Sequence, residues 1–387
     1  MITYIEKLLN GQSVEWKTLG EVAEIKRGDR ITKNQLVSQG KYPVVSGGTK
    51  PLGYYDQANR SAETITVAQY GTAGYVDWQS QDFWANDVCY SIFPHPGVDN
   101  RYLYYVLCNK QSMIYSLVTE AIPAHLPRQK LSSVFIPIPP LSVQEEIVRI
   151  LDKFTELEAE LEAELEARKQ QYEYYRNSLL SFANDLEGGG KIVFKTLGEV
   201  FFMRNGYTPS KAKKEFWEGG TIPWYRMEDL RAGTRVLSDA IQHVTPEAIK
   251  GKGLFKANSI IMATTATIGE HALLAVEALA NQQFTNFEIK PEYQAVLLPK
   301  FAYYYFFVID AWCKQNTNVS SFPSVAISNL KTQEIPIPPL TEQARIVNIL
   351  DKFDALTNSL TEGLPQEIEL RRKQYEYYRE QLLSFPA

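Results

Sequence analysis

The sequence predicts an α+β protein in which two mostly-β domains are joined by two long helices that pair as an antiparallel coiled coil. Short motifs recur in the same order in both halves of the chain, and each half ends in a long stretch of helical periodicity. The length of 387 residues and the hydrophobic fraction of 44% allow more than one core. The expected architecture is therefore an internal repeat with pseudo-twofold symmetry.

The repeat consists of nearly identical frames around dissimilar interiors. The frame motifs at 17–22, 136–141, 147–154, 171–176 and 179–182 recur at 195–200, 335–340, 346–353, 374–379 and 382–385. The separation between copies grows from 178 to 199 and then to 203 residues, so the second copy has gained length in its domain and in its helix. The interiors share only weak marks, such as Gly28 with Gly206 and Asn86 with Asn281. Dissimilar interiors in one frame indicate two domains with different tasks.

The long helices are predicted at 143–182 and 342–385, each with apolar residues at steps of three and four. Each follows a Pro-Pro pair, so Ser142 and Thr341 are the expected N-cap residues, with Glu145 completing a capping box in the first helix. Gly363 and Pro365 are expected to kink or interrupt the second helix. Two such apolar stripes can bury each other, which predicts the coiled coil.

A tandem Leu-Glu-Ala-Glu repeat occupies 157–167 of the first helix. Leucine at every fourth position stays on one face of a helix, and Glu and Ala are strong helix formers, so a solvated helix face explains part of the pattern. Each unit of four residues lengthens a helix by about 6 Å. The repeat is therefore also predicted to set the length of a spacer.

Four segments follow from these motifs: a first domain at 1–141, a first spacer helix at 142–187, a second domain at 188–340 and a second spacer helix at 341–387. The formal net charge of −5 divides among them as +1, −7, +3 and −2. Electrostatic attraction is screened within about 8 Å at physiological salt, so the local charge matters more than the total. The two domains are mildly basic and the helices are acidic.

Sequence motifs for catalysis and metal binding are missing. A DNA adenine methyltransferase needs an Asn/Asp-Pro-Pro-Tyr/Phe loop, but both Pro-Pro pairs stand in Ile-Pro-Ile-Pro-Pro-Leu. The sequence contains neither GxGxxG nor GxxxxGK[ST]. Its four His and three Cys are scattered, so no metal ligands and no disulfide framework are predicted. We expect a protein without catalytic residues.

The chain is also expected to be cytoplasmic and free of the membrane. Its first residues lack a basic region followed by an apolar core, so no signal peptide is predicted. The apolar run at 301–309 is too short to span a bilayer, which requires roughly 20 residues, and is interpreted as a buried helix.

The order of domain, long helix, domain and long helix resembles the specificity subunits of type I restriction–modification systems. The resemblance is carried by Val-Glu-Trp-Lys-Thr-Leu-Gly-Glu-Val at 14–22, Ile-Pro-Ile-Pro-Pro-Leu at 136–141 and Gln-Tyr-Glu-Tyr-Tyr-Arg at 171–176, and it extends over nearly the whole chain. It implies that each domain is a target-recognition domain for half of a split site in double-stranded DNA. It also implies helices that dock two methyltransferase subunits, joined by restriction subunits that translocate DNA. S-adenosylmethionine, ATP and Mg would then belong to those partners, with no cofactor in this chain.

Basic residues are the expected contacts to phosphates, and polar residues are the expected contacts to base edges. For any single basic residue, a solvated surface charge is the more common explanation. In the first domain they are Arg27, Arg30, Lys33, Lys50, Arg60, Gln69, Tyr70, Thr72 and Arg128. In the second they are Arg204, Lys211, Lys213, Lys214, Arg226, Arg231, Thr264, Thr265, Gln282, Gln283, Ser320, Ser321 and Ser324.

The repeated tyrosines are candidates for partner docking. They are Tyr172, Tyr174 and Tyr175 with their copies Tyr375, Tyr377 and Tyr378. We expect one tyrosine of each set in the coiled-coil core and the others on the docking face.

Two alternatives to a DNA-recognition subunit remain at this stage. A fused methyltransferase would bind S-adenosylmethionine as an isolated chain. A coiled-coil scaffold between two proteins would shift no DNA, and its interactions would be insensitive to salt.

Overall fold

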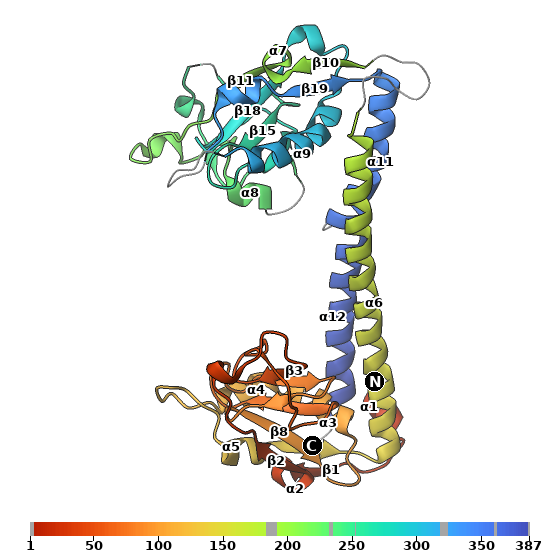
Figure 1. The fold of residues 1–387 in the computed structure, drawn as a ribbon. Coiled ribbons are helices and arrows are strands. Elements are labelled where there is room, and N and C mark those ends of the chain that lie inside the picture. The colour runs from red at the N-terminus through yellow and green to blue at the C-terminus, as the bar shows by residue number, and fades with distance from the viewer. Residues whose placement is uncertain are drawn as a thin grey trace. The chain divides into compact units, whose positions relative to one another are not determined.

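The computed structural model describes residues 4–182, 192–231, 235–251, 253–317, 324–359 and 362–385. The chain divides into two compact units, Met1–Glu160 with Leu370–Ala387 and Leu161–Glu369. Each unit combines one globular domain with parts of the long helices (Figure 1). Among the described residues, no helix is long and apolar enough to cross a membrane.

The first domain is mostly β, as expected. Its strands are β1 (Glu15–Thr18), β2 (Ala23–Arg27), β3 (Tyr42–Val45), β4 (Tyr54–Tyr55), β5 (Thr64–Ala68), β6 (Val76–Gln79), β7 (Trp84–Ala85), β8 (Cys89–Pro94) and β9 (Phe135–Ile138). Its helices are α1 (Tyr4–Leu9), α2 (Leu19–Val22), η1 (Lys33–Gln35), α3 (Asn100–Asn109), α4 (Gln111–Ser116) and α5 (Arg128–Ser132). The described strands form a sheet in the order β2-β8-β5-β6, a second sheet β4-β3-β7 and the pair β1-β9.

The second domain repeats this plan with additions. Its strands are β10 (Val193–Thr196), β11 (Phe201–Asn205), β12 (Ile222–Tyr225), β13 (Val236–Leu237), β14 (His243–Val244), β15 (Ile260–Ala263), β16 (His271–Leu274), β17 (Leu279–Ala280), β18 (Phe284–Ile289) and β19 (Glu334–Ile337). Its helices are α7 (Leu197–Val200), η2 (Lys214–Phe216), α8 (Met227–Arg231), η3 (Pro246–Ala248), η4 (Pro291–Tyr293), α9 (Pro299–Gln315) and α10 (Ile327–Lys331).

Part of the extra length of the second domain builds new elements. Strand β12 pairs antiparallel with β14 and parallel with β17, just as β3 pairs with β4 and β7. Between β12 and β14, where the first domain has only a loop, stand α8 and β13. Strand β13 pairs in parallel with β16 and extends the described sheet to β11-β18-β15-β16-β13. The insertion therefore enlarges one sheet and leaves the shared plan intact.

The long helices are α6 (Leu141–Leu179), α11 (Leu340–Asn358) and α12 (Gly363–Leu383). In the first unit the Phe154 ring of α6 lies 6.5 Å from Tyr375 and 5.3 Å from Tyr378 of α12. In the second unit the rings of Tyr172 and Tyr175 of α6 lie 6.1 and 5.5 Å from Phe353 of α11. Early residues of α6 thus pack on late residues of the second helical stretch and late residues on early ones, which confirms an antiparallel pair.

The ends of the long helices complete the two hydrophobic cores. Leu382 and Leu383 at the end of α12 are buried in the core of the first unit. Leu180, just after α6, is buried in the core of the second unit. Burying one leucine side chain stabilises a fold by about 1.5–3 kcal/mol. The repeated Leu-Leu-Ser-Phe motif therefore anchors each helix end in the domain that the other half of the sequence supplies.

The predicted N-caps are wrong. Helix α6 begins at Leu141 and α11 at Leu340, so Ser142 and Thr341 lie inside the helices. The N-cap of α11 is Pro339, which makes no side-chain cap bond. The physical reason is that the prolyl carbonyl already accepts the first helical N–H bond, from Val143 to Pro140 at 2.9 Å in the first helix.

The predicted interruption of the second helix is confirmed. Helix α11 ends at Asn358 and α12 begins at Gly363, whose φ is +79°. A Cβ at Gly363 would lie 2.5 Å from the carbonyl oxygen of Ala355, so only glycine fits there. The four positions 359–362 between the helices equal the four residues by which the second helical stretch exceeds the first. The added length falls between 353 and 374, the segment that contains this break.

A buried glutamine joins each domain to its long helix. Gln144 is fully buried, and its Oε1 accepts from the Asp99 N–H at 2.8 Å. Its Nε2 donates to the carbonyl oxygens of Pro139 at 2.8 Å and Gly97 at 3.2 Å. Both polar atoms of this side chain are therefore bonded to the backbone, either just before α3 or at the entry to α6.

The second unit repeats this bonding pattern at Gln343, 199 residues later. Its Oε1 accepts from the Leu298 N–H at 2.8 Å, and its Nε2 donates to the carbonyls of Val296 at 2.8 Å and Pro338 at 2.7 Å. Because the three bonds hold both the loop before α9 and the entry to α11, this residue sets the angle between domain and helix within the unit.

Candidate nucleic-acid interface

In each domain, the glycine and the asparagine that the two interiors share lie next to each other. A Cβ on Gly28 would lie 2.2 Å from the Ala85 carbonyl oxygen and 2.3 Å from that of Asn86. A Cβ on Gly206 would lie 2.3 Å from the carbonyl oxygens of both Ala280 and Asn281. In each domain two chain segments therefore cross with their backbones in contact. Glycine is required at this crossing, because any side chain would collide with the carbonyl oxygens of the other segment. The crossing positions the loops that follow β2 and β11.

In the first domain, two of the arginines that the sequence predicts as DNA contacts stabilise this crossing. The Arg27 Nε donates to the Asp87 carbonyl oxygen. Arg60 is half-buried and donates to the Ser91 hydroxyl at 3.1 Å and to the carbonyls of Asn59 at 2.7 Å and Arg27 at 3.0 Å. Arg60 therefore acts within the protein, whereas the Arg27 side chain remains exposed.

The predicted polar turn after β5 packs against the loop before α5. The Tyr70 ring stacks on His125 with centroids 5.4 Å apart, and the backbone carbonyl of Gln69 accepts from the Leu126 N–H at 2.9 Å. The Thr72 hydroxyl donates to the Gly47 carbonyl at 2.8 Å. The buried Gln69 Oε1 has no hydrogen-bond partner among the residues that the structure describes. This turn is thus held rigidly at the surface with a polar group unsatisfied.

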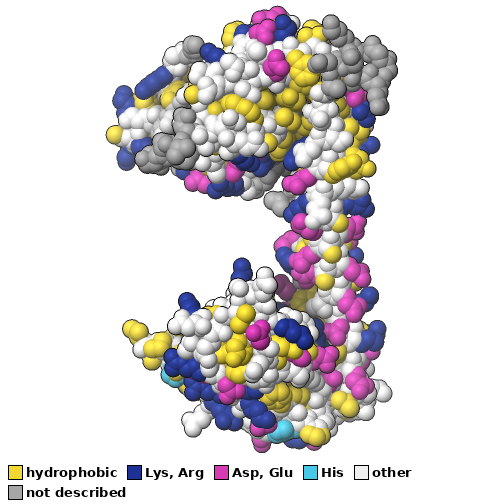
Figure 2. All heavy atoms as spheres, viewed as in Figure 1, with side chains coloured by type: hydrophobic (Ala, Val, Ile, Leu, Met, Phe, Trp, Pro, Cys, Tyr) yellow, Lys and Arg dark blue, Asp and Glu magenta, His cyan; other side chains and the backbone are white. Residues whose placement is uncertain are grey.

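Tyr90 connects the two groups of candidates. Its hydroxyl donates to the Leu126 carbonyl at 3.2 Å. Burial raises the pKa of Tyr90, and the positive charges of Arg27 and Arg128 act in the opposite direction. The charges of Arg27 and Arg128 therefore act on the buried Tyr90, whose hydroxyl is bonded next to the loop that packs on the Tyr70 turn. Lys and Arg side chains gather on the side of this domain where α5 lies (Figure 2).

Exposure separates the first-domain candidates. The exposed side chains are Arg27, Arg30, Lys33, Lys50, Thr72 and Arg128. The half-buried ones are Arg60, Gln69 and Tyr70.

In the second domain, the arginines predicted as DNA contacts form hydrogen bonds or ion pairs with other groups of the protein. Arg204 donates to the carbonyls of Gly253 at 2.8 Å and Leu254, and its guanidinium lies 4.7 Å from the Phe255 ring centroid. The guanidinium of Arg226 pairs with Glu228 at 3.1 Å, and that of Arg231 pairs with Glu270 at 3.4 Å. Arg204 thus acts like Arg60 and fixes a loop.

A polar network brings other second-domain candidates together. The Thr264 and Thr285 hydroxyls are 3.1 Å apart, and Thr285 donates to Asn205 Oδ1 at 2.9 Å. The Gln283 Oε1 accepts from Asn281 at 3.1 Å. Thr264 is buried, so its side chain positions this network and is not available to DNA.

The turn after β15 repeats the geometry of the turn after β5. Thr264 accepts from the Val325 N–H at 3.0 Å, and Thr265 forms a bridge with Ser324. The neighbouring Gln282 Oε1 accepts from the Thr208 hydroxyl at 2.6 Å. Ser320 and Ser321 lie outside the described residues.

The predicted lysine cluster is exposed on the segment around η2. Lys213 lies 3.5 Å from Glu215 and Lys214 lies 3.7 Å from Glu218, and all four side chains are more than half exposed. Exposed pairs at these distances contribute little to stability and exchange readily. Lys211, which is also exposed, and these two lysines can therefore still bind phosphate.

Asp152 and Asp351 on the long helices are positioning residues that the sequence analysis did not identify. Asp152 accepts from Arg101 at 2.8 Å and from the Tyr105 hydroxyl, and in the second unit Asp351 accepts from Lys300 at 2.7 Å. The sequence does mark them, because they occupy equivalent positions in the frame motif at 147–154 and in its copy at 346–353. Together with the buried glutamines they position the domains on the helices.

The tyrosine sets divide between core and surface. Tyr172 is buried at 5% exposure, and Tyr375 and Tyr378 pack against Phe154. Tyr174 and Tyr377, which occupy equivalent positions, are 69% and 60% exposed. These two rings are the most available of the predicted docking residues.

Among the described residues, two buried titratable groups have strongly shifted pKa values. Burial lowers the pKa of His271 to about 3, so this histidine is a neutral core residue, with ring nitrogens 3.1 and 3.2 Å from the carbonyls of Gly269 and Tyr303. Burial raises the pKa of Cys89 to about 12, so its thiol is unreactive. Within the described ranges, no group of three or more His, Cys, Asp or Glu could hold a metal ion.

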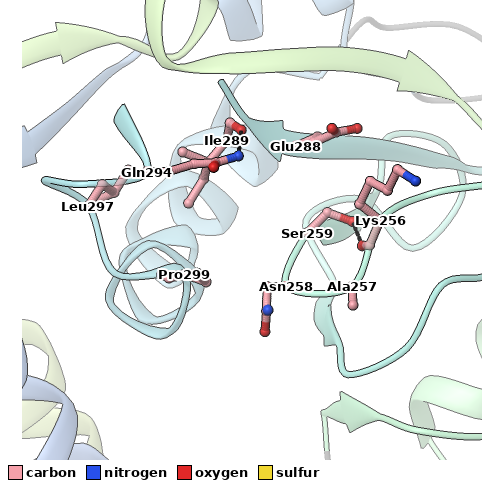
Figure 3. A pocket seen from close by; sticks show the side chains of 9 residues that line it. All are labelled: Lys256, Ala257, Asn258, Ser259, Glu288, Ile289, Gln294, Leu297 and Pro299. Carbon is pink, nitrogen blue, oxygen red and sulfur yellow. Dashed lines mark hydrogen bonds between the residues drawn. The ribbon is translucent and has the colours of Figure 1, made fainter. Parts of the chain in front are cut away.

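A cleft of about 310 Å³ in the second domain lies between the loop before β15 and the start of α9 (Figure 3). Its lining includes Lys256, Glu288 and Ser259. Lys256 pairs with Glu277 at 2.7 Å, and the Ser259 hydroxyl donates to the Lys256 carbonyl at 2.6 Å. The hydroxyl also accepts from Asn286 Nδ2 at 2.7 Å, so it is bonded within the protein on both sides.

Comparison with known proteins supports a DNA-recognition role. The profile of the type I restriction modification DNA specificity domain matches residues 12–167 and 190–370. The chain belongs to the type I restriction–modification DNA specificity family. As a specificity subunit it is a non-catalytic DNA-recognition protein, so the fused methyltransferase and the scaffold without DNA are both set aside.

Known proteins of this family match the chain over nearly all of its residues. It is 38% identical to the Escherichia coli "Type I restriction enzyme EcoR124I/EcoR124II specificity subunit", over 100% of this chain and 98% of the relative. It is 35% identical to the Haemophilus influenzae "Putative type I restriction enzyme specificity subunit S.HindORF215P", over 99% and 98%. The fold matches a crystal structure of the type I system S subunit from M. genitalium with a TM-score of 0.61, at 19% identity and 98% coverage of both chains.

Proposed function

We propose that each of the two domains binds one half of a bipartite DNA site and that the long helices set the gap between the halves. The observation that supports this most directly is the repeated plan with different surfaces. The turn and loop that meet at Tyr70 and His125 in the first domain meet again at Thr265 and Ser324 in the second. Equivalent positions with different side chains are what two different half-sites require.

The partners are DNA together with methyltransferase and restriction subunits, and we propose two methyltransferase subunits. Exposed apolar side chains recur at equivalent positions of the two halves: Tyr174 and Tyr377 at 69% and 60%, Leu141 and Leu340 at 47% and 44%. An exposed apolar side chain adds little to the fold, and its exact repetition is explained by two copies of one partner. S-adenosylmethionine, ATP and Mg belong to these partners in this proposal, and the complex works on DNA in the cytoplasm.

The form of the recognised site tests the proposal. Methylome sequencing of a host that expresses this chain with its partners should show methylated adenines at N6 within two defined sequences separated by a constant, undefined gap. A single continuous site, or binding of labelled S-adenosylmethionine by the isolated chain, would contradict it. Affinity for the site should fall steeply with salt, because phosphate contacts release counterions.

The stoichiometry is tested at the two exposed tyrosines. Tyr174→Ala and Tyr377→Ala should each weaken the binding of one methyltransferase subunit by about 30-fold, the effect of losing an interface aromatic worth about 2 kcal/mol. Native mass spectrometry should show one subunit lost from each single variant and both from the double variant. Tyr54→Ala, at a tyrosine 47% exposed in the first domain, is the matched control and should leave the assembly intact. Unchanged assembly of the double variant would exclude this docking surface.

A further inference from the structure

The loop between α4 and α5 ends in an apolar tip that the fold does not use. Ile122 is fully exposed, with a relative exposure of 101%, while no other large apolar side chain of the described residues exceeds 69%. The neighbouring Ala121, Pro123 and Ala124 are also exposed. Figure 1 shows this loop projecting from the body of the first domain, and Figure 2 shows hydrophobic atoms at its end.

Hydrogen bonds close the base of the loop. Thr119 and His125 close it through the Thr119 N–H to the His125 carbonyl at 2.9 Å and the His125 N–H to the Thr119 hydroxyl at 3.2 Å. The Thr119 hydroxyl also lies 2.9 Å from His125 Nδ1. The His125 ring stacks on Tyr70, and the next residue, Leu126, is fully buried. The tip is therefore presented at a defined place beside the polar turn that carries the candidate base contacts.

The chemistry of the tip does not suit phosphate. Between Thr119 and His125 the loop has no Lys or Arg and has one exposed carboxylate, Glu120, which phosphates repel. The cations are at its foot instead, where Arg128 and Lys130 are exposed on α5. Cations at the foot and an apolar, acidic end fit a loop that passes between phosphates and reaches base edges.

Only the major groove offers partners for both side chains of the tip. Thymine presents its C5-methyl group there, which an isoleucine can cover, and cytosine presents its N4 amino group, which a carboxylate can accept from. The minor groove presents mainly acceptors, which a carboxylate cannot use. We propose that the loop 119–125 enters the major groove of the half-site bound by the first domain and that Ile122 contacts a thymine methyl group.

This inference rests on the proposed function and adds a specificity residue that the sequence did not suggest. The test uses the assembled complex with its methyltransferase partner and duplexes in which each thymine of the site is replaced in turn by deoxyuridine, which lacks the methyl group. The wild-type complex should lose about fourfold in affinity at one thymine or two adjacent thymines of one half-site, the effect of about 0.8 kcal/mol per buried carbon.

The variants identify the contact. Ile122→Ala should bind the normal duplex about as weakly as the wild type binds the uracil duplex and should show no further loss with uracil at that position. Ile122→Val should keep most of the response. Ile241→Ala, at an isoleucine 61% exposed in the second domain, should leave the response of this half-site unchanged.

Two results would overturn the contact and leave the bipartite site standing. One is a wild-type complex that binds its bipartite site without any uracil-sensitive thymine coupled to Ile122. The other is an Ile122→Ala complex that loses affinity equally for all duplexes, which would assign the tip to a protein partner. Failure of the wild-type complex to bind two separated half-sites would instead refute the proposed function itself.

Discussion

Deleting residues 161–164, one Leu-Glu-Ala-Glu unit, is expected to shorten the gap between the two half-sites and to leave both half-site sequences unchanged. Helix α6 is continuous from Leu141 to Leu179 and contributes to both compact units. Removing four residues shortens it by about 6 Å and rotates the following part by about 40°. The shortening is just under two base-pair rises of about 3.4 Å. The original site should therefore lose methylation, and a site with a shorter gap should gain it.

Methylome sequencing of the deletion strain checks this prediction. Exchanging Glu162 and Ala163 is the matched control, because both residues are exposed and the exchange alters the sequence while keeping the length of the helix. The control should keep the original gap. An unchanged gap after the deletion would show that α6 does not act as the spacer. Altered half-sites would show that the deletion disturbs the domains and not only their separation.

Replacing Gln343 with leucine is expected to destabilise the second unit by about 3 kcal/mol or more. The amide is fully buried and makes three bonds to backbone groups, which leucine would leave without partners. Each unsatisfied buried group costs about 1–3 kcal/mol. The side chain has nearly the same volume, so the loss arises from polar groups and not from a cavity.

Hydrogen exchange localises the effect of Gln343→Leu. The Leu298 amide and the first turn of α11 should lose protection, while the equivalent positions around Gln144 in the first unit should keep theirs. A lower urea midpoint should accompany the change. Gln333→Leu is the control, because this half-buried side chain makes one bond, to the Asn329 carbonyl at 3.3 Å. Equal effects of the two variants would show that the buried glutamine has no special role.

Much of the fold could be predicted because it depends on periodicity and repetition. The apolar steps of α6 specify a helix wherever the chain can bury them, and two stripes of this kind specify a pair. Gly363 could be recognised as an interruption because its backbone conformation is a local property. The N-caps failed for the opposite reason. At Ser142 the local sequence favours a cap, but the preceding proline carbonyl is already placed to accept the first bond.

The candidate interface could be predicted only in part. The turns at Tyr70 and Thr265 were found from their polar composition, and the structure brings each against a second loop. The arginines show the limit, because nothing in the local sequence distinguishes Arg60, whose donors bind protein, from exposed Arg128. The sequence analysis did not identify Ile122, because nothing in the surrounding Ala-Ile-Pro-Ala segment indicates that the isoleucine side chain is exposed.

The chain alone specified two domains, two helical stretches and the tetrapeptide spacer, since composition and spacing act over short distances along the sequence. The tertiary structure decided which charges stay free and which helix end completes which core. Both depend on residues such as Leu180 and Leu382, which pack against segments far away in the chain. Contacts at that separation follow from the packing of the whole unit, because each is stable only when the rest of its core has formed.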